Sequence, residues 1–129
     1  MKNSTYLLVY GTLRKGVGHP MHWILERYGI CQGTGSFRGK LFDLGRFPGA
    51  TASGNDSDCV VGEIYRLQRA SKALAILDDY EGDLFQRTQV SARVNDRKTI
   101  TAWTYLYTGT VKTHRRITSG DYIVFLNRS

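Results

Sequence analysis

Long hydrophobic runs are missing from this sequence, and their absence excludes several classes of protein. No window approaches the length of a membrane-spanning helix. The N-terminal apolar run Tyr6–Tyr10 is shorter than a signal-peptide core, and no small-residue cleavage site follows it. We therefore expect a cytoplasmic protein without a membrane partner. The 129 residues contain no internal repeat, linker or low-complexity tract, which predicts a single domain over residues 1–129.

Cysteine and histidine are also scarce. Cys31 and Cys59 lie far apart, without metal-ligand spacing. We expect buried free thiols, although the sequence leaves a disulfide between them open. His19 and His22 are predicted to share a helix face, but no third ligand accompanies them, and His114 falls in a polar loop. The sequence also lacks a Ser-His-Asp or Cys-His arrangement and a nucleotide-binding glycine motif, so we expect neither a metal nor a cofactor.

Acidic residues are outnumbered, with 11 Asp and Glu against 18 Lys and Arg, which gives a formal charge of +7. Such a balance is compatible with nucleic acid, an anionic surface or a small anionic substrate as a partner. The cations are spread along the chain. No tract is dense enough for a nucleic-acid arm, and no predicted helix carries a basic stripe. A solvated basic surface accounts for this distribution, so we expect no nucleic-acid partner.

The stretch from Tyr6 to Gly16 begins as a strand and ends as a polar loop. Its first part, Tyr6–Tyr10, is an unbroken aromatic and aliphatic run, which is typical of a strand covered on both faces. Gly11 ends this run, and a hydroxyl, two cations and a second glycine follow. Main-chain N–H groups in such a loop can form a concave site for an anion or an oxyanion. Taken alone, the pattern favours the simpler alternative, an ordinary turn after a buried strand.

The rest of the chain alternates between helical and strand patterns. Apolar residues at helical spacing predict one short helix over 21–28 and a second over about 69–79. Strands are expected over 39–45, 47–51, 59–67, 85–94 and 100–107. A hairpin turn is expected at 95–98, and the tail 119–126 forms either a last strand or a short closing element. This order predicts an α+β fold, a mixed and mostly antiparallel β-barrel with two or more flanking helices.

Four carboxylates lie close together at the C-terminal end of the second predicted helix. They are Asp78, Asp79, Glu81 and Asp83. Negative charge at this end of a helix is unfavourable by about 0.3–1 kcal/mol per group, because of the helix macrodipole. Crowded like charges also raise the pKa of at least one carboxyl group. A solvated acidic turn and a general acid/base site both remain open. A calcium loop is excluded, because Leu84 and Val90 occupy its glycine and distal glutamate positions.

Short motifs follow one another along nearly the whole chain. They are Val9–Arg14, Gly39–Gly45, Phe47–Gly49, Val61–Tyr65, Leu77–Gly82, Phe85–Arg87 and Ser119–Tyr122. In this order they resemble the γ-glutamylcyclotransferase-like family, including its small γ-glutamylamine cyclotransferases of the AIG2-like type. Tyr122 stands where tryptophan is common in that family, a departure that we expect to leave the chemistry unaffected.

The resemblance implies a barrel whose pocket binds a small-molecule γ-glutamyl substrate through Tyr10, Gly11, Thr12 and Leu13, with Glu81 as the catalytic residue. In the implied reaction, the α-amine of the substrate attacks its own γ-glutamyl carbonyl and releases 5-oxoproline and an amine or amino acid. Glu81 would act as general acid/base, and neither a metal nor a cofactor is implied. A non-catalytic small-molecule binding protein with the same fold and pocket is the alternative.

Elementary chemistry is consistent with this implication. Holding the tethered amine near its carbonyl contributes about 7–11 kcal/mol, one carboxyl group can move the proton, and loop N–H groups can stabilise the oxyanion. We expect Arg14 to add positive potential near the pocket, and the segments 17–20 and 108–118 to contact the amine side of the substrate. The sequence leaves open the leaving group and the oligomeric state, monomer or weak dimer.

Overall fold

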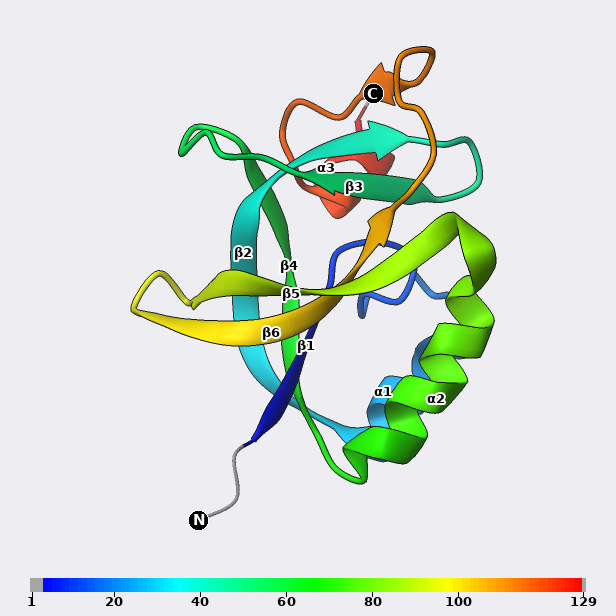
Figure 1. The fold of residues 1–129 in the computed structure, drawn as a ribbon, viewed down its shortest axis with the longest axis vertical. Coiled ribbons are helices and arrows are strands. Elements are labelled where there is room, and N and C mark those ends of the chain that lie inside the picture. The colour runs from blue at the N-terminus through cyan, green and yellow to red at the C-terminus, as the bar shows by residue number, and fades with distance from the viewer. Residues whose placement is uncertain (1–3, 129) are drawn as a thin grey trace.

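Five strands close into a barrel in the computed structural model, which describes residues 4–128 (Figure 1). They are β1 (Thr5–Val9), β2 (Gly29–Asp43), β4 (Cys59–Leu67), β5 (Phe85–Val94) and β6 (Lys98–Tyr107). β1 pairs antiparallel with β4 and parallel with β6. β5 pairs antiparallel with β6 and β2, and β2 pairs antiparallel with β4. This circuit confirms the predicted α+β fold with a mixed, mostly antiparallel barrel.

Helices and two short strands flank the barrel. The helical segments are η1 (Pro20–His22), α1 (Trp23–Tyr28), α2 (Ala70–Glu81), η2 (Gly82–Leu84) and α3 (Tyr122–Leu126). The strands β3 (Pro48–Ala52) and β7 (Arg115–Arg116) both pair with the second half of β2. α1 and α2 lie side by side on one flank of the barrel (Figure 1). Within residues 4–128, no helix has the length and apolar character needed to span a membrane.

The glycine-rich stretch forms one strand of 15 residues, much longer than the predicted segment 39–45. Its glycines stand where neighbours approach closely. A Cβ atom on Gly35 would lie 2.4 Å from the Ile64 side chain, and one on Gly39 would lie 2.7 Å from the carbonyl oxygen of Thr51. Because glycine has no side chain, these positions erase the alternation that reveals a strand. The first half of β2 was therefore missed.

The tail ends in helix α3, which settles the choice between a strand and a closing element. The Asp121 carboxylate caps this helix by accepting hydrogen bonds from the N–H groups of Ile123 and Val124. The first predicted helix opens with a 3₁₀ turn, so its α-helical part is restricted to Trp23–Tyr28. The second helix extends past its predicted end to Glu81.

Both cysteines are free and exposed, so the predicted burial of Cys31 and Cys59 is wrong. Successive residues of a strand point to opposite faces. Cys59 therefore faces outward, because the next residue, Val60, points into the barrel. Cys31 stands at the irregularity of the β2–β4 pairing, where the register shifts.

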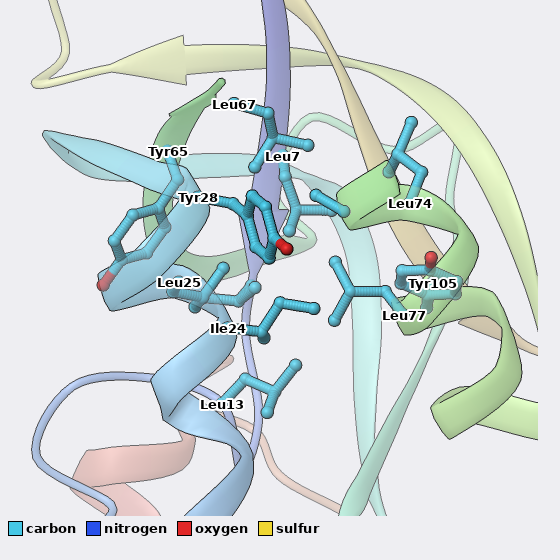
Figure 2. Close-up of a cluster of buried hydrophobic side chains, with 12 residues drawn as sticks. Leu7, Leu13, Ile24, Leu25, Tyr28, Tyr65, Leu67, Leu74, Leu77 and Tyr105 are labelled. Carbon is cyan, nitrogen blue, oxygen red and sulfur yellow. The ribbon is translucent and has the colours of Figure 1, made fainter. Parts of the chain in front are cut away.

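Strand β1 separates two hydrophobic cores, as expected for a strand covered on both faces. Leu8 and Tyr10 point into the barrel, whereas Leu7 and Val9 point outward, toward α1 and α2. Figure 2 shows the outer core, in which side chains of both helices meet those of β1, β4 and β6. This outer core fixes the position of α2 on the barrel.

We predict that Leu77→Ala lowers the free energy of unfolding by about 2–5 kcal/mol. Leu77 is fully buried in the outer core, so truncating it leaves a cavity between α2 and the barrel. Equilibrium urea unfolding measures the change. Lys72→Ala on the exposed face of the same helix should change it by no more than about 0.5 kcal/mol. Equal effects of the two substitutions would contradict this account of α2.

Candidate active site

A cavity of about 320 Å³ opens between the end of β1 and the C-terminal end of α2. Its lining includes every residue predicted for the site, Tyr10–Leu13 and Glu81. The first group follows β1 directly, whereas Glu81 is the last residue of α2. The packing of α2 against β1 and β6 therefore brings together two motifs that lie far apart in the sequence.

Glu81 is partly buried, and this burial raises the pKa of its carboxyl group to about 7. The sequence led us to expect that crowding by neighbouring carboxylates would raise a pKa here, whereas burial is what raises the pKa of Glu81. A carboxyl group with this pKa exists in both protonation states near neutral pH. It can therefore accept a proton in one step and return it in the next.

The three neighbouring carboxylates are directed elsewhere. Asp79 and Asp83 are exposed. Asp78 accepts two hydrogen bonds from the Arg87 guanidinium, at 2.9 and 3.2 Å, and one from the Tyr105 hydroxyl at 2.6 Å. Although burial opposes it, these hydrogen bonds hold the pKa of Asp78 below its usual range. Of the acidic cluster, only Glu81 lines the cavity.

The Gly11 loop, residues 11–16, begins with a tight turn in which the Arg14 N–H donates to the Gly11 carbonyl oxygen at 3.1 Å. A Cβ atom on Gly11 would lie 2.9 Å from Cγ of Pro48, so glycine permits the close approach of β3. Within residues 4–128, the N–H groups of Gly11, Thr12 and Leu13 donate to no protein acceptor. These main-chain donors are available to a bound anion or oxyanion.

The Tyr10 side chain connects the barrel to the flanking strand β3 beneath this loop. Its hydroxyl donates to the Tyr105 carbonyl oxygen at 2.5 Å and accepts from the Ala50 N–H at 3.0 Å. Burial raises the pKa of Tyr10 far above its ordinary value, so the hydroxyl stays protonated. With both hydrogen bonds formed, this hydroxyl links β6 to β3. We therefore expect Tyr10 to contact a substrate through its main chain and ring.

Leu13 anchors the other side of the loop. Its side chain packs with Ile24 and Leu25 in the outer core (Figure 2). Its carbonyl oxygen lies 2.7 Å from Nδ1 of His22. Since a carbonyl oxygen only accepts, this contact requires a hydrogen on Nδ1 of His22. The loop is thus fixed both by packing and by a hydrogen bond from η1.

Arg14 does not reach the cavity, so the predicted contribution to positive potential is wrong. It is buried, and its guanidinium donates to Glu63 at 3.1 Å and to Asp121 at 2.9 Å. The other oxygen of Glu63 accepts from the Lys15 N–H at 2.9 Å. Arg14 therefore ties the Gly11 loop to β4 and to the cap of α3. Its role is to hold the loop, because two carboxylates already compensate its charge.

The cavity wall also contains residues that sequence reasoning missed. Neither 17–20 nor 108–118 lines it; the outer wall is formed by Phe47, Pro48, Leu84 and Phe85. The signal was present, because Phe47 and Phe85 belong to the motifs noted above, but the sequence does not reveal that these motifs face each other. Their rings lie 5.9 Å apart.

The histidines do not share a helix face as predicted. His19 precedes η1, and its Nδ1 accepts from the Met21 N–H at 3.0 Å, so Nε2 carries the hydrogen. That Nε2 donates to the Tyr80 hydroxyl at 3.2 Å, which places His19 behind the cavity wall. Within residues 4–128, no group of three or more His, Cys, Asp or Glu side chains could hold a metal ion.

Comparison with known proteins shows to which family this chain belongs. Residues 7–124 match the family model described as "Gamma-glutamyl cyclotransferase, AIG2-like". The chain belongs to this family. A Vibrio cholerae protein, named provisionally as a gamma-glutamylcyclotransferase, is 35% identical over 121 residues, which cover 90% of this chain and 93% of the relative. The names of this family and of this relative both refer to cyclotransferase chemistry.

Solved structures have the same fold. The AIG2-like protein of Mus musculus superposes with a TM-score of 0.70 at 22% identity, covering 91% of this chain and 88% of that one. The Escherichia coli protein ytfP superposes with a TM-score of 0.65 at 29% identity, covering 92% and 96%. The barrel with its flanking helices is thus the fold of the AIG2-like proteins.

We predict that Arg14→Leu lowers the free energy of unfolding by about 3–5 kcal/mol, because it leaves Glu63 and Asp121 without their shared cation. Arg38→Leu is the matched control. Its ion pair with Asp56 is exposed, and removing it should cost less than about 1 kcal/mol. Urea unfolding of both variants measures the difference. A loss below 1 kcal/mol for Arg14→Leu would show that the ion pairs of Arg14 with Glu63 and Asp121 do not stabilise the fold.

The raised pKa of Glu81 predicts a pH-dependent stability. The folded protein holds this proton up to about pH 7, whereas the unfolded chain releases it near 4.5. This stabilisation is present below pH 4.5 and is lost as pH rises through 7. Glu81→Gln, which mimics the protonated form, should therefore gain stability relative to the original protein, on the order of 3 kcal/mol by pH 8. Denaturation at several pH values tests this, and a constant difference would exclude it.

Proposed function

We propose that this protein is a γ-glutamylcyclotransferase that converts a γ-glutamyl amide into 5-oxoproline and a free amine or amino acid. One observation carries the proposal. A carboxyl group with a pKa of about 7 shares a cavity with the N–H groups of Gly11, Thr12 and Leu13, which donate to no acceptor among residues 4–128. Membership of the gamma-glutamyl cyclotransferase, AIG2-like family supports the same reaction.

The cavity supplies the groups that ring closure needs. The substrate brings its own nucleophile, because attack of the α-amine on the γ-carbonyl closes a five-membered ring. Glu81 in its carboxylate form removes a proton from the amine. As the C–N bond to the leaving group breaks, the protonated Glu81 returns this proton to the departing nitrogen. The same side chain thus serves as base and acid in one turnover.

The Gly11 loop supplies the electrostatic part of the mechanism. The γ-carbonyl oxygen gains negative charge in the tetrahedral intermediate, and the substrate also carries an α-carboxylate. The N–H groups of Gly11, Thr12 and Leu13 are donors available to these two groups. Because Tyr10, Leu13 and Arg14 anchor the loop, its donors need little reorganisation during the reaction.

We predict that Glu81→Gln lowers kcat for 5-oxoproline release by about 10²–10⁴-fold, because the amide retains the shape of the side chain and cannot transfer the proton. In the original protein, kcat/KM should rise with pH through about 7 as Glu81 loses its proton. Release of 5-oxoproline from γ-glutamyl amides, followed by chromatography, measures both effects.

Asp83→Asn is the matched control, since it removes an exposed carboxylate two positions further along the chain. It should retain the kcat of the original protein. If γ-glutamyl compounds bind without release of 5-oxoproline, and binding is unchanged in Glu81→Gln, the protein is the non-catalytic binding protein considered as the alternative.

A further inference from the structure

We propose that Asp78 is a positioning residue that holds the Arg87 guanidinium and the Tyr105 hydroxyl away from the Glu81 carboxyl group. Asp78 does not line the cavity, so it acts on the reaction only through its neighbours. The inference rests on the proposed function, because it concerns the group that transfers the proton there. It gives a second residue of the acidic cluster a role in the proposed reaction.

Two donors from the barrel converge on Asp78. Arg87 and Tyr105 stand directly opposite each other in the pairing of β5 with β6, so their side chains lie on the same face of the sheet. On that face both reach α2, where Asp78 accepts two hydrogen bonds from Arg87 and one from Tyr105. The guanidinium carbon of Arg87 also lies 4.4 Å from the centroid of the Trp103 ring. The ring and the carboxylate together fix the direction of the guanidinium.

Glu81 is the next carboxylate on the same side of α2. It follows Asp78 by three residues, and side chains at this spacing are neighbours on a helix surface. Tyr105 lines the cavity together with Glu81. Burial and the hydrogen bond to Asp78 raise the pKa of Tyr105, and the negative charge of Glu81 contributes to the rise. Without the Asp78 carboxylate, Glu81 offers both donors a carboxylate one helical turn away.

The Glu81 carboxyl group has no such partner in the structure. Within residues 4–128 it forms no ion pair, and burial is the cause of its raised pKa. The other ionisable groups in the cavity lining are the hydroxyls of Tyr10, Tyr80 and Tyr105, and β3, β5 and η2 add none. A cation or a hydrogen-bond donor at Glu81 would favour its charged form and lower its pKa. Holding Arg87 elsewhere therefore preserves proton exchange near neutral pH.

The ion pair predicts effects of opposite sign for its two members. While both are present, the charges of Asp78 and Arg87 compensate each other next to Glu81. Asp78→Asn leaves the Arg87 cation beside Glu81, which should lower the pKa of Glu81. Arg87→Gln leaves the Asp78 anion instead, which should raise it. Removing both members together should return the pKa of Glu81 close to its original value.

A pH titration of the full chain, followed by ¹³C NMR of the Glu81 side-chain carboxyl carbon, tests these expectations without a substrate. We expect the midpoint to fall by about one pH unit in Asp78→Asn and to rise by about half a unit in Arg87→Gln. The double variant should titrate near the original midpoint. In each variant, the pH dependence of kcat/KM for 5-oxoproline release should move in the same direction as the midpoint.

Asp79→Asn is the matched control. It removes a carboxylate from the next position of α2, where the side chain is exposed, whereas both donors are directed to Asp78. The titration midpoint of Glu81 should remain unchanged in this variant. An equal fall in Asp79→Asn and Asp78→Asn would show that any negative charge at this helix end has the same effect, and it would overturn the specific role of Asp78.

A purely structural role of the ion pair gives a different pattern. If the pair only kept α2 in place, either substitution would admit water to Glu81 and lower its pKa. A fall in both variants, or no change in either, therefore overturns the proposal. Arg87→Gln retains every carboxylate of α2, and it decides the question by itself if Asp78→Asn does not fold.

Failure of the proposed function would be recognised separately. If no γ-glutamyl amide yields 5-oxoproline, the protein is not the proposed enzyme, whatever the titrations show. Opposite shifts in Asp78→Asn and Arg87→Gln would still support the control of Glu81 by Asp78, because the titration reports on the carboxyl group and not on turnover.

Discussion

The removal of one carboxyl group from water is the constraint on which the site depends. Glu81 stands at the last position of α2, the end of a helix where negative charge is least favoured, and burial there raises its pKa to about 7. This burial exists only because α2 packs on the outer face of the barrel through Ala73, Leu74 and Leu77. The outer hydrophobic core therefore determines both the position and the protonation of the group proposed to act in catalysis.

Three side chains hold the Gly11 loop in place. Tyr10 joins two strands below it, Leu13 inserts into the outer core, and Arg14 is enclosed by carboxylates of β4 and of the α3 cap. Each anchor uses a side chain, which leaves the main-chain N–H groups between them unpaired within the described residues. The loop's free donors are therefore main-chain N–H groups, while the Arg14 side chain serves to anchor the loop.

Strong local patterns made much of the fold predictable. The strand Cys59–Leu67 and the hairpin that begins at Phe85 have the expected positions, because β-branched and aromatic residues alternate there. The buried character of β1 followed from its unbroken apolar run. The first half of β2 was not predictable, because its glycines remove the side chains that would show the period. The exposure of Cys31 and Cys59 was also missed, since composition does not tell which face a residue occupies.

By itself, the sequence determined the local elements, the family motifs and the identity of the candidate residues, because these depend on neighbouring positions in the chain. The tertiary structure alone decided that Glu81, and not Asp78, lines the cavity, that Arg14 is used as a clamp, and that the outer wall is apolar. These features depend on contacts between distant segments, and burial, charge pairing and pKa are set by such contacts.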